Sequence, residues 1–302
     1  MKMSQFSFFT APLDYKELTG GLSLLEAASP TVTVKKVGKS ILGRTIPALW
    51  WGEGEQTVLL VGAHHGMEWI TGNLLMAFLQ ELMELYAQND ENALQFYRVL
   101  RLVVIPQLNP DGVEMALHGA NPHHPLYGRQ LRMNGGSTDF SHWQANARGV
   151  DLNHNYAVGF YEYKETEKQM GIFDGAPTRF SGNAPESEPE TAALATYIRI
   201  LRPSLILTLH TQGEEIYYDA MNATPAMHKT AKELSRKTGY TLATAEGAAA
   251  FGGLTEWAVS CKIPCYTLEC GKGKNPLPIT DAPLMYQRLK NALFSLPNLS
   301  IL

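Results

Sequence analysis

Three apolar runs in this sequence each lead to a residue that can bind a metal ion or transfer a proton. The runs cover residues 58–63, 204–209 and 264–268, and they are followed by His65, His210 and Glu269. Short, nearly continuous apolar runs are typical of strands in a parallel sheet that is covered on both faces. Ligands of an open α/β sheet gather outside the carboxyl ends of its strands, so these three side chains are expected to converge there.

The first of these positions carries a second metal-binding residue. His65-Gly-Met-Glu68 pairs an imidazole with a carboxylate at a strand-to-helix junction. A catalytic zinc takes three protein ligands of the nitrogen and oxygen type and keeps one position open for water. His210 is the candidate for the third ligand, because it ends another predicted strand. The sequence therefore predicts one Zn²⁺ per chain, bound by His65, Glu68 and His210.

The bulk composition is that of an ordinary globular protein. The 302 residues are 45% hydrophobic and 18% charged, with a formal net charge of −4. A chain of this length can bury a substantial core. A slightly acidic chain without a basic cluster argues against nucleic acid as a partner and favours a small substrate. The composition does not indicate the oligomeric state.

The sequence also bears on the cellular compartment. It shows no apolar stretch long enough for a signal peptide or a membrane span, so we expect no membrane association and a cytoplasmic location. Its three cysteines fit a reducing compartment better than a disulfide framework. Cys265 and Cys270 are an odd number of residues apart in a strand-like run, which predicts two buried thiols on opposite faces and no joint metal site.

Strand and helix patterns alternate along the chain. Strands are predicted at residues 31–37, 46–51, 58–63, 99–108, 204–210 and 264–269, and helices at 70–86, 190–201, 225–238 and from 281 onward. This alternation, with no linker or internal repeat, predicts a single α/β domain over residues 1–302, with a mostly parallel mixed sheet flanked by helices. Residues 1–30 are expected to form an N-terminal extension.

The connecting segments give further predictions. Asn109-Pro-Asp-Gly112 has the composition of a strong turn, and Ser187-Glu-Pro-Glu190 has the form of a capping box at the start of a helix. Residues 113–149 are rich in Gly, Asn, Pro, His and Ser and have no sustained periodicity. A loop of that length inside a domain is usually functional or disordered, and the flanking strands favour a functional loop.

Several of these residues, taken in order, resemble the zinc metallocarboxypeptidase family over residues 30–280. His65, Glu68 and His210 are similar to the zinc ligands of that family, and Glu269 resembles its catalytic glutamate. The resemblance implies that Arg132 polarises the scissile carbonyl and that Asp151 orients the first zinc histidine. Each of these residues also has a purely structural interpretation. Glu269 would then be an ion-paired carboxylate, Arg132 a solvated loop arginine and Asp151 a turn-capping residue.

Within the family, three stretches look like the bacterial branch that cleaves γ-D-glutamyl-diamino acid bonds in peptidoglycan peptides. These stretches are residues 133–141, 149–153 and 271–278. The resemblance implies a small peptide substrate, a peptidoglycan fragment whose diamino acid is meso-diaminopimelate or lysine. Hydrolysis of imported fragments during recycling would reconcile that substrate with a cytoplasmic enzyme.

Two departures from the family bear on the substrate. The chain has Asn153-His154 where digestive carboxypeptidases have the Asn-Arg pair that binds a terminal carboxylate, and residues 248–251 read Ala-Ala-Ala-Phe where the family has a mobile tyrosine. A γ-D-glutamyl-diamino acid carries several carboxylates, so its pocket needs cationic groups. Those available in the sequence are Arg129, Arg132, His154, Lys272 and Lys274.

Other functions share much of this pattern. A broader metallocarboxypeptidase or a deacylase of small acyl amino acids would use the same ligand set. A catalytically silent muropeptide sensor would keep the fold without turnover, although a sensor has no need of Glu269 or Arg132.

Overall fold

The apolar runs form the centre of an eight-stranded mixed sheet in the computed structural model, which describes residues 7–219 and 221–300. The strand order is β1-β2-β4-β3-β5-β8-β6-β7. The strands are β1 (Thr33–Lys39), β2 (Thr45–Trp51), β3 (Gln56–Val61), β4 (Leu100–Ile105), β5 (Leu205–His210), β6 (Glu215–Tyr217), β7 (Thr241–Ala243) and β8 (Cys265–Glu269).

The register of the central strands brings the predicted site residues to one edge. Strands β4, β3, β5 and β8 pair in parallel, and the register places His210 opposite Glu269. β1 and β2 extend the sheet on one side by antiparallel pairing, and β6 does so on the other. The sheet is therefore mixed with a parallel centre, as predicted.

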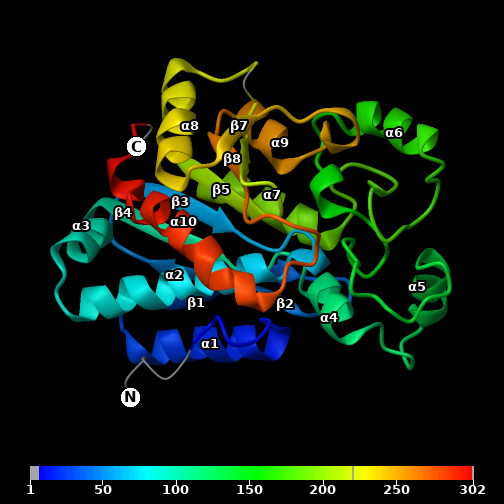
Figure 1. Ribbon diagram of the computed structural model, residues 1–302, viewed down its shortest axis with the longest axis horizontal. Coiled ribbons are helices and arrows are strands. Elements are labelled where there is room, and N and C mark those ends of the chain that lie inside the picture. Colours follow the sequence, from blue (N-terminus) through cyan, green and yellow to red (C-terminus); the bar gives the residue numbers. More distant parts are fainter. Residues whose placement is uncertain (1–6, 220, 301–302) are drawn as a thin grey trace.

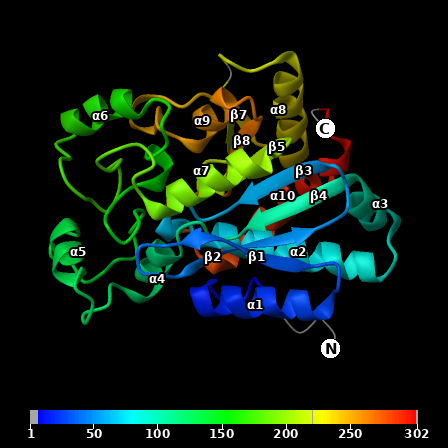
Figure 2. The same cartoon turned by 180° about the vertical axis from the view of Figure 1, so that it is seen from behind.

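Helices cover both faces of the sheet (Figures 1 and 2). Alternate residues of a strand point to opposite faces, so Leu60 packs into one core and its neighbours Leu59 and Val61 into the other. Figure 1 looks onto α2 and α10, and Figure 2 onto α7. The α-helices are α1 (Tyr15–Ala28), α2 (Ile70–Ala87), α3 (Glu91–Val99), α4 (Pro110–His118), α5 (Tyr127–Met133), α6 (Phe160–Gln169), α7 (Pro189–Leu201), α8 (Pro225–Thr238), α9 (Leu254–Ser260) and α10 (Ala282–Phe294).

The N-terminal segment is part of this layered structure. The described part of the expected extension contains α1, whose Leu18, Leu22 and Leu25 are buried in the same core as α2 and α10. Residues 1–6 of that extension lie outside the described residues. In the part of the chain that the structure describes, no helix is both long enough and apolar enough to cross a membrane.

Two local predictions were wrong. Residues 109–112 begin helix α4 instead of forming a turn, because the Asn109 side chain accepts a hydrogen bond from the Gly112 amide and Pro110 occupies the first helical turn. The expected capping box does not form at α7. The Glu190 carboxylate instead accepts a hydrogen bond from the Ile41 amide at 3.0 Å, a contact between residues far apart in the sequence.

The predicted long loop is partly helical. Residues 113–149 contain most of α4 and all of α5, separated by irregular backbone. Most of the chain between α4 and α7 lies beyond the ends of the central strands, on the right of Figure 1. This segment therefore builds the surroundings of His65, His210 and Glu269. The helices predicted near residues 225–238 and 281 are α8 and α10, and Thr224 and Gly239 cap α8 as expected.

Candidate active site

The structure brings His65, Glu68 and His210 together at the carboxyl edge of the sheet. His65 follows β3, Glu68 lies on a single 3₁₀ turn after it, and His210 is the last residue of β5. The turn packs tightly, since a Cβ atom on Gly66 would lie 2.3 Å from the Gly112 carbonyl oxygen. Only glycine fits there, and this close approach fixes where His65 and Glu68 point.

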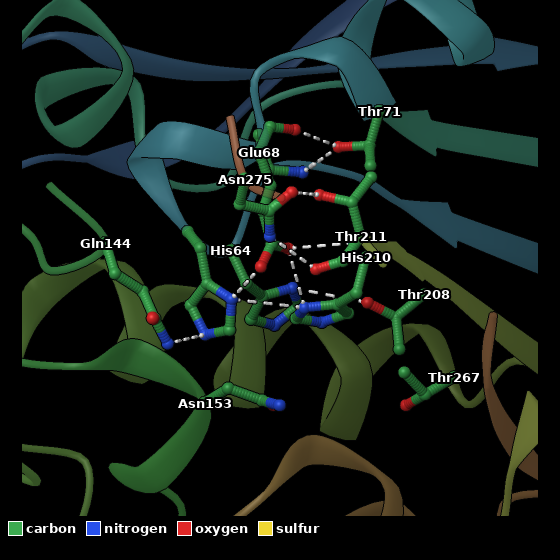
Figure 3. A network of polar contacts seen from close by, with 12 residues as sticks. His64, Glu68, Thr71, Gln144, Asn153, Thr208, His210, Thr211, Thr267 and Asn275 are labelled. Carbon is green, nitrogen blue, oxygen red and sulfur yellow. Dashed lines mark hydrogen bonds and ion pairs between the residues drawn. The ribbon is translucent and has the colours of Figure 1, made fainter. Parts of the chain in front are cut away.

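The ligand atoms of these three side chains converge on one point (Figure 3). The His65 Nδ1 atom lies 2.8 Å from Glu68 Oε1, and the His210 Nδ1 atom lies 3.1 Å from Glu68 Oε2. The two Nδ1 atoms are 3.3 Å apart. Two imidazole nitrogens and one carboxylate oxygen, all buried, make the donor set of a catalytic zinc site.

The electrostatics of this cluster favour a cation. Burial alone would raise the pKa of Glu68, but the imidazoles of His65 and His210 lower it to about 2. Burial alone would lower the pKa of His65, but the carboxylates of Glu68 and Asp151 raise it well above its ordinary value. The cluster therefore attracts positive charge into a buried position. A divalent cation held by the same donor atoms fits this demand.

Asp151 lies behind His65. Its Oδ1 atom is 3.1 Å from His65 Nε2, on the side of the ring opposite Glu68. Its Oδ2 atom accepts hydrogen bonds from Gln144 Nε2 at 2.8 Å and from the Arg179 amide at 3.1 Å. A carboxylate in this position fixes the tautomer and the orientation of a metal-binding histidine.

Glu269 lies at the end of β8, beside His210 in the sheet register. Burial raises its pKa well above the ordinary value, and the negative charges of Glu68 and Glu215 act in the same direction. Among the described residues it forms no ion pair with a lysine or arginine, which removes the ion-paired alternative. A buried carboxyl group of raised pKa beside a metal site is suited to take up and return a proton.

Glu269, His65 and His210 open into one cavity of about 680 Å³. Hydrogen bonds order part of its wall. The Asn153 side-chain oxygen accepts one from the Leu254 amide, and the hydroxyl groups of Thr255 and Thr267 form another with each other. The charged residues in the wall, apart from Glu269 and the histidines, are Arg179, Lys274 and Glu256. The other polar residues in the wall are Gln144, Asn153, His154, Thr178, Thr211, Gln212, Tyr217, Thr255, Thr267 and Asn275.

Three of the expected cationic residues are not in the cavity wall. Arg132 is exposed on α5, Arg129 pairs with Asp174 at 2.6 Å, and the Lys272 ammonium pairs with Glu214 at 3.2 Å with its side chain 70% exposed. The roles expected for Arg132, Arg129 and Lys272 therefore have no support in this geometry.

The rotation of α5 explains the position of Arg132. Gln130 is the buried residue of α5, and its Nε2 atom donates to the Ala147 carbonyl at 2.8 Å. Successive helical residues turn by about 100°, so Arg132 lies about 200° around the helix from Gln130. The hydrogen bond that anchors α5 to the protein thus turns Arg132 toward solvent.

Sequence reasoning missed the residues that line the cavity beside His65. Gln144 donates to Asp151 and also lies 3.1 Å from His65 Nε2, while Thr178 donates to the Gln144 side-chain oxygen at 2.9 Å. Arg179 follows Thr178 and lines the same wall. These residues lie in irregular segments, and no periodicity or motif marks them.

His154 lies in the cavity wall, and two contacts hold its ring in place. Its ring stacks on Tyr163 with 3.7 Å between ring centroids, and its Nδ1 atom lies 2.8 Å from the Phe251 carbonyl oxygen. Burial lowers its pKa, although the Asp151 carboxylate acts in the opposite direction. His154 is therefore a neutral ring near neutral pH, which is a poor substitute for an arginine.

Comparison with known proteins agrees with this geometry. The zinc carboxypeptidase family matches residues 21–282. Gamma-D-glutamyl-L-diamino acid endopeptidase 1 of Lysinibacillus sphaericus is 31% identical over 280 residues, which are 91% of this chain and 69% of that protein. The catalytic chain of human carboxypeptidase N is 28% identical over 206 residues, covering 65% of this chain and 41% of its own length.

Solved structures share the fold. Bovine thrombin-activatable fibrinolysis inhibitor superposes with a TM-score of 0.76 at 17% identity, covering 98% of this chain and 99% of that one. Murein-tripeptide amidase MpaA of Escherichia coli O157 superposes with a TM-score of 0.53 at 20% identity, covering 86% and 91%. The fold, the convergent ligand atoms and these matches lead to one conclusion: the chain is a metallopeptidase of the zinc carboxypeptidase family.

Proposed function

We propose that this enzyme hydrolyses the amide bond between the γ-carboxyl group of D-glutamate and a diamino acid, meso-diaminopimelate or lysine, in peptidoglycan fragments. One observation carries the proposal: a single cavity joins the His65, Glu68 and His210 cluster to Glu269 and to side chains of both charges. In this proposal His65, Glu68 and His210 hold one zinc ion, and Asp151 orients His65.

The catalytic chemistry follows from the positions of these groups. Zinc bound at this site would supply a Lewis acid and bring the pKa of water to about 7. Glu269 takes the proton of the attacking water and gives it to the leaving nitrogen, so that the diamino acid departs as an amine. The raised pKa of Glu269, caused mainly by burial, suits a group that must both accept and donate this proton.

The charges of the cavity support a diamino acid substrate. A γ-D-glutamyl link leaves the glutamate α-carboxylate beside the scissile amide, and the diamino acid adds a carboxylate and a second amine. Arg179 and Lys274 offer positive charge, whereas Glu256 is a half-buried carboxylate with no cationic partner among residues 7–219 and 221–300. A neutral substrate would leave the half-buried Glu256 carboxylate without a cationic partner, which is costly, and it would give Arg179 and Lys274 no anion to bind.

The named relatives point in the same direction. One is called a gamma-D-glutamyl-L-diamino acid endopeptidase, and a structural neighbour is called a murein-tripeptide amidase. The carboxypeptidase alternative differs in its substrate, since it would remove residues from α-linked peptides.

The test compares substrates on the purified zinc enzyme. We expect kcat/KM for L-Ala-γ-D-Glu-diaminopimelate to exceed that for α-linked peptides ending in leucine, phenylalanine or lysine by about 100-fold or more, because a substrate that pairs the polar groups of a site is favoured strongly over one that leaves them unpaired. Equal or better rates on the α-linked peptides would favour the general carboxypeptidase. Hydrolysis of acyl amino acids alone would favour the deacylase, and binding without turnover the sensor.

A further inference from the structure

Arg179 is a cation in the cavity wall that has no acidic partner among the described residues. Its side chain is exposed, and its guanidinium makes one hydrogen bond within the described structure, to the sulfur of Met170 at 3.8 Å. A guanidinium is always charged and offers five donors in a planar fork that matches a carboxylate. This fork is therefore available to a ligand.

The backbone holds Arg179 firmly beside the catalytic groups. Its amide donates to Asp151 Oδ2 at 3.1 Å, and its carbonyl accepts a hydrogen bond from the Tyr163 hydroxyl at 3.3 Å. Tyr163 is also the residue on which His154 stacks. These contacts place Arg179 on the same wall as His154.

His154 cannot itself bind a carboxylate in its present form. Its Nδ1 atom faces the Phe251 carbonyl, which can only accept a hydrogen bond, so Nδ1 carries the proton. The Nε2 atom of the neutral ring is then an acceptor and repels a carboxylate. The positive charge for a substrate carboxylate must come from another residue on this wall.

Asn153 provides a further donor on this wall. Asn153 uses its side-chain oxygen to accept from the Leu254 amide, while its Nδ2 atom has no protein partner among the described residues (Figure 3). Asn153 therefore offers a neutral donor and Arg179 the charge. Lys274 is another exposed cation that lines the cavity, on the loop that follows β8, but its ammonium group is a point charge without the planar fork of a guanidinium.

We propose that Arg179 binds the free α-carboxylate of the leaving diamino acid, in place of the arginine that is absent at position 154. The proposal rests on the proposed function and makes it more specific. A substrate would have to end in the diamino acid, because a longer peptide has converted this carboxylate into an amide. The enzyme would then release a terminal residue and discriminate against extended peptides.

The test uses three peptides that differ only beyond the scissile bond. They are L-Ala-γ-D-Glu-L-Lys with a free carboxylate, its C-terminal carboxamide, and the same peptide extended by D-alanine. We expect the wild-type enzyme to favour the free acid by about 10- to 100-fold in kcat/KM, the range of a charge-assisted hydrogen bond. Arg179→Met should reduce this preference to about 3-fold or less by lowering only the rate on the acid, and Arg179→Lys should retain part of it.

Arg129→Met is the matched control, because Arg129 belongs to an ion pair outside the cavity wall. It should keep the full preference. A second measurement avoids turnover: calorimetric titration of zinc-free protein with γ-D-Glu-L-Lys and with its carboxamide should show the same preference in the wild type and its loss in Arg179→Met.

Two outcomes would overturn the role of Arg179. One is a wild-type enzyme with no preference for the free acid, and the other is an Arg179→Met variant that loses activity equally on acid and amide, which indicates a structural role. If the enzyme cleaves only α-linked peptides, the proposed function fails. The same comparison of acid and amide on an α-linked peptide then decides the role of Arg179 by itself.

Discussion

The two walls of the catalytic cavity are built in different ways. One wall consists of strand ends, where His210 and Glu269 are neighbours in the β5–β8 ladder. The other consists of irregular chain between α4 and α7, which supplies Gln144, Asn153 and Arg179. The backbone ladder positions the first wall regardless of most side-chain identities, whereas the second depends on individual polar side chains.

Buried amide side chains hold the irregular wall in place. Asn146 accepts hydrogen bonds from the Arg148 and Val150 amides and donates to Glu188 at 2.7 Å. Asn155 donates to the Ser181 carbonyl at 2.7 Å and accepts from the Glu188 amide. The bonds to Glu188 and Ser181 join residues far apart in the sequence, so the wall is as specific as the strand ends without being periodic.

The largest expected effect concerns the strand-end wall. Wild-type protein should bind about one zinc per chain, and His65→Ala and His210→Ala should lose it, because each removes one of three ligands. Metal analysis after dialysis measures this loss. His123→Ala changes an exposed loop histidine and should keep the metal. Full zinc retention in both ligand variants would refute the ligand assignment.

Glu269→Gln should separate metal binding from proton transfer. The amide nearly preserves the shape of the side chain and removes the base, so zinc content should stay the same while kcat falls about 10²- to 10⁴-fold. Steady-state kinetics together with metal analysis on the same sample gives both quantities. A variant with wild-type kcat would exclude Glu269 from the reaction.

The contribution of Glu190 to stability should depend on pH, which provides a test of the contacts that hold the irregular wall. Glu190 is fully buried, holds the Ile41 amide and lies 3.3 Å from Asn146, and burial raises its pKa to about 7. The fold therefore favours the protonated acid. Its stabilising contribution is complete below about pH 4.5 and is lost as the pH rises through about 7.

Replacement of this group should remove that pH dependence. Raising the pKa of Glu190 from 4.5 to about 7 corresponds to on the order of 3 kcal/mol, so the difference in unfolding free energy between wild type and Glu190→Gln should change by about this amount from pH 4.5 to pH 8. Urea unfolding at both pH values measures it. Glu55→Gln, at an exposed position, should show no such change. A constant difference for Glu190→Gln would contradict the assignment.

The smallest effect is expected at Arg132. Because this side chain is exposed on α5, Arg132→Met should change kcat/KM by no more than about 2-fold, in line with ordinary surface substitutions. Comparison with Arg179→Met under identical conditions isolates the contribution of the cavity wall. A tenfold loss at Arg132 would mean that α5 reaches the substrate during the reaction.

The sequence predicted the parallel centre of the sheet and the helices α2, α7, α8 and α10 from local patterns. Apolar runs and helical periodicity indicate which face of a single element is buried. They can therefore be recognised without knowledge of the element that packs against that face. The start of α4 and the contact of Glu190 with Ile41 were not predictable in this way, since short polar motifs have several local meanings and a tertiary partner selects among them.

The same division applies to the site. By itself the sequence determined which residues end the central strands, and a parallel sheet has only one edge to which His65, His210 and Glu269 can be carried. The tertiary structure alone decided that Arg132 faces solvent and that Gln144 and Arg179 line the cavity. The physical reason is that repetitive backbone hydrogen bonds position strand ends, while long-range bonds from single buried side chains position an irregular chain.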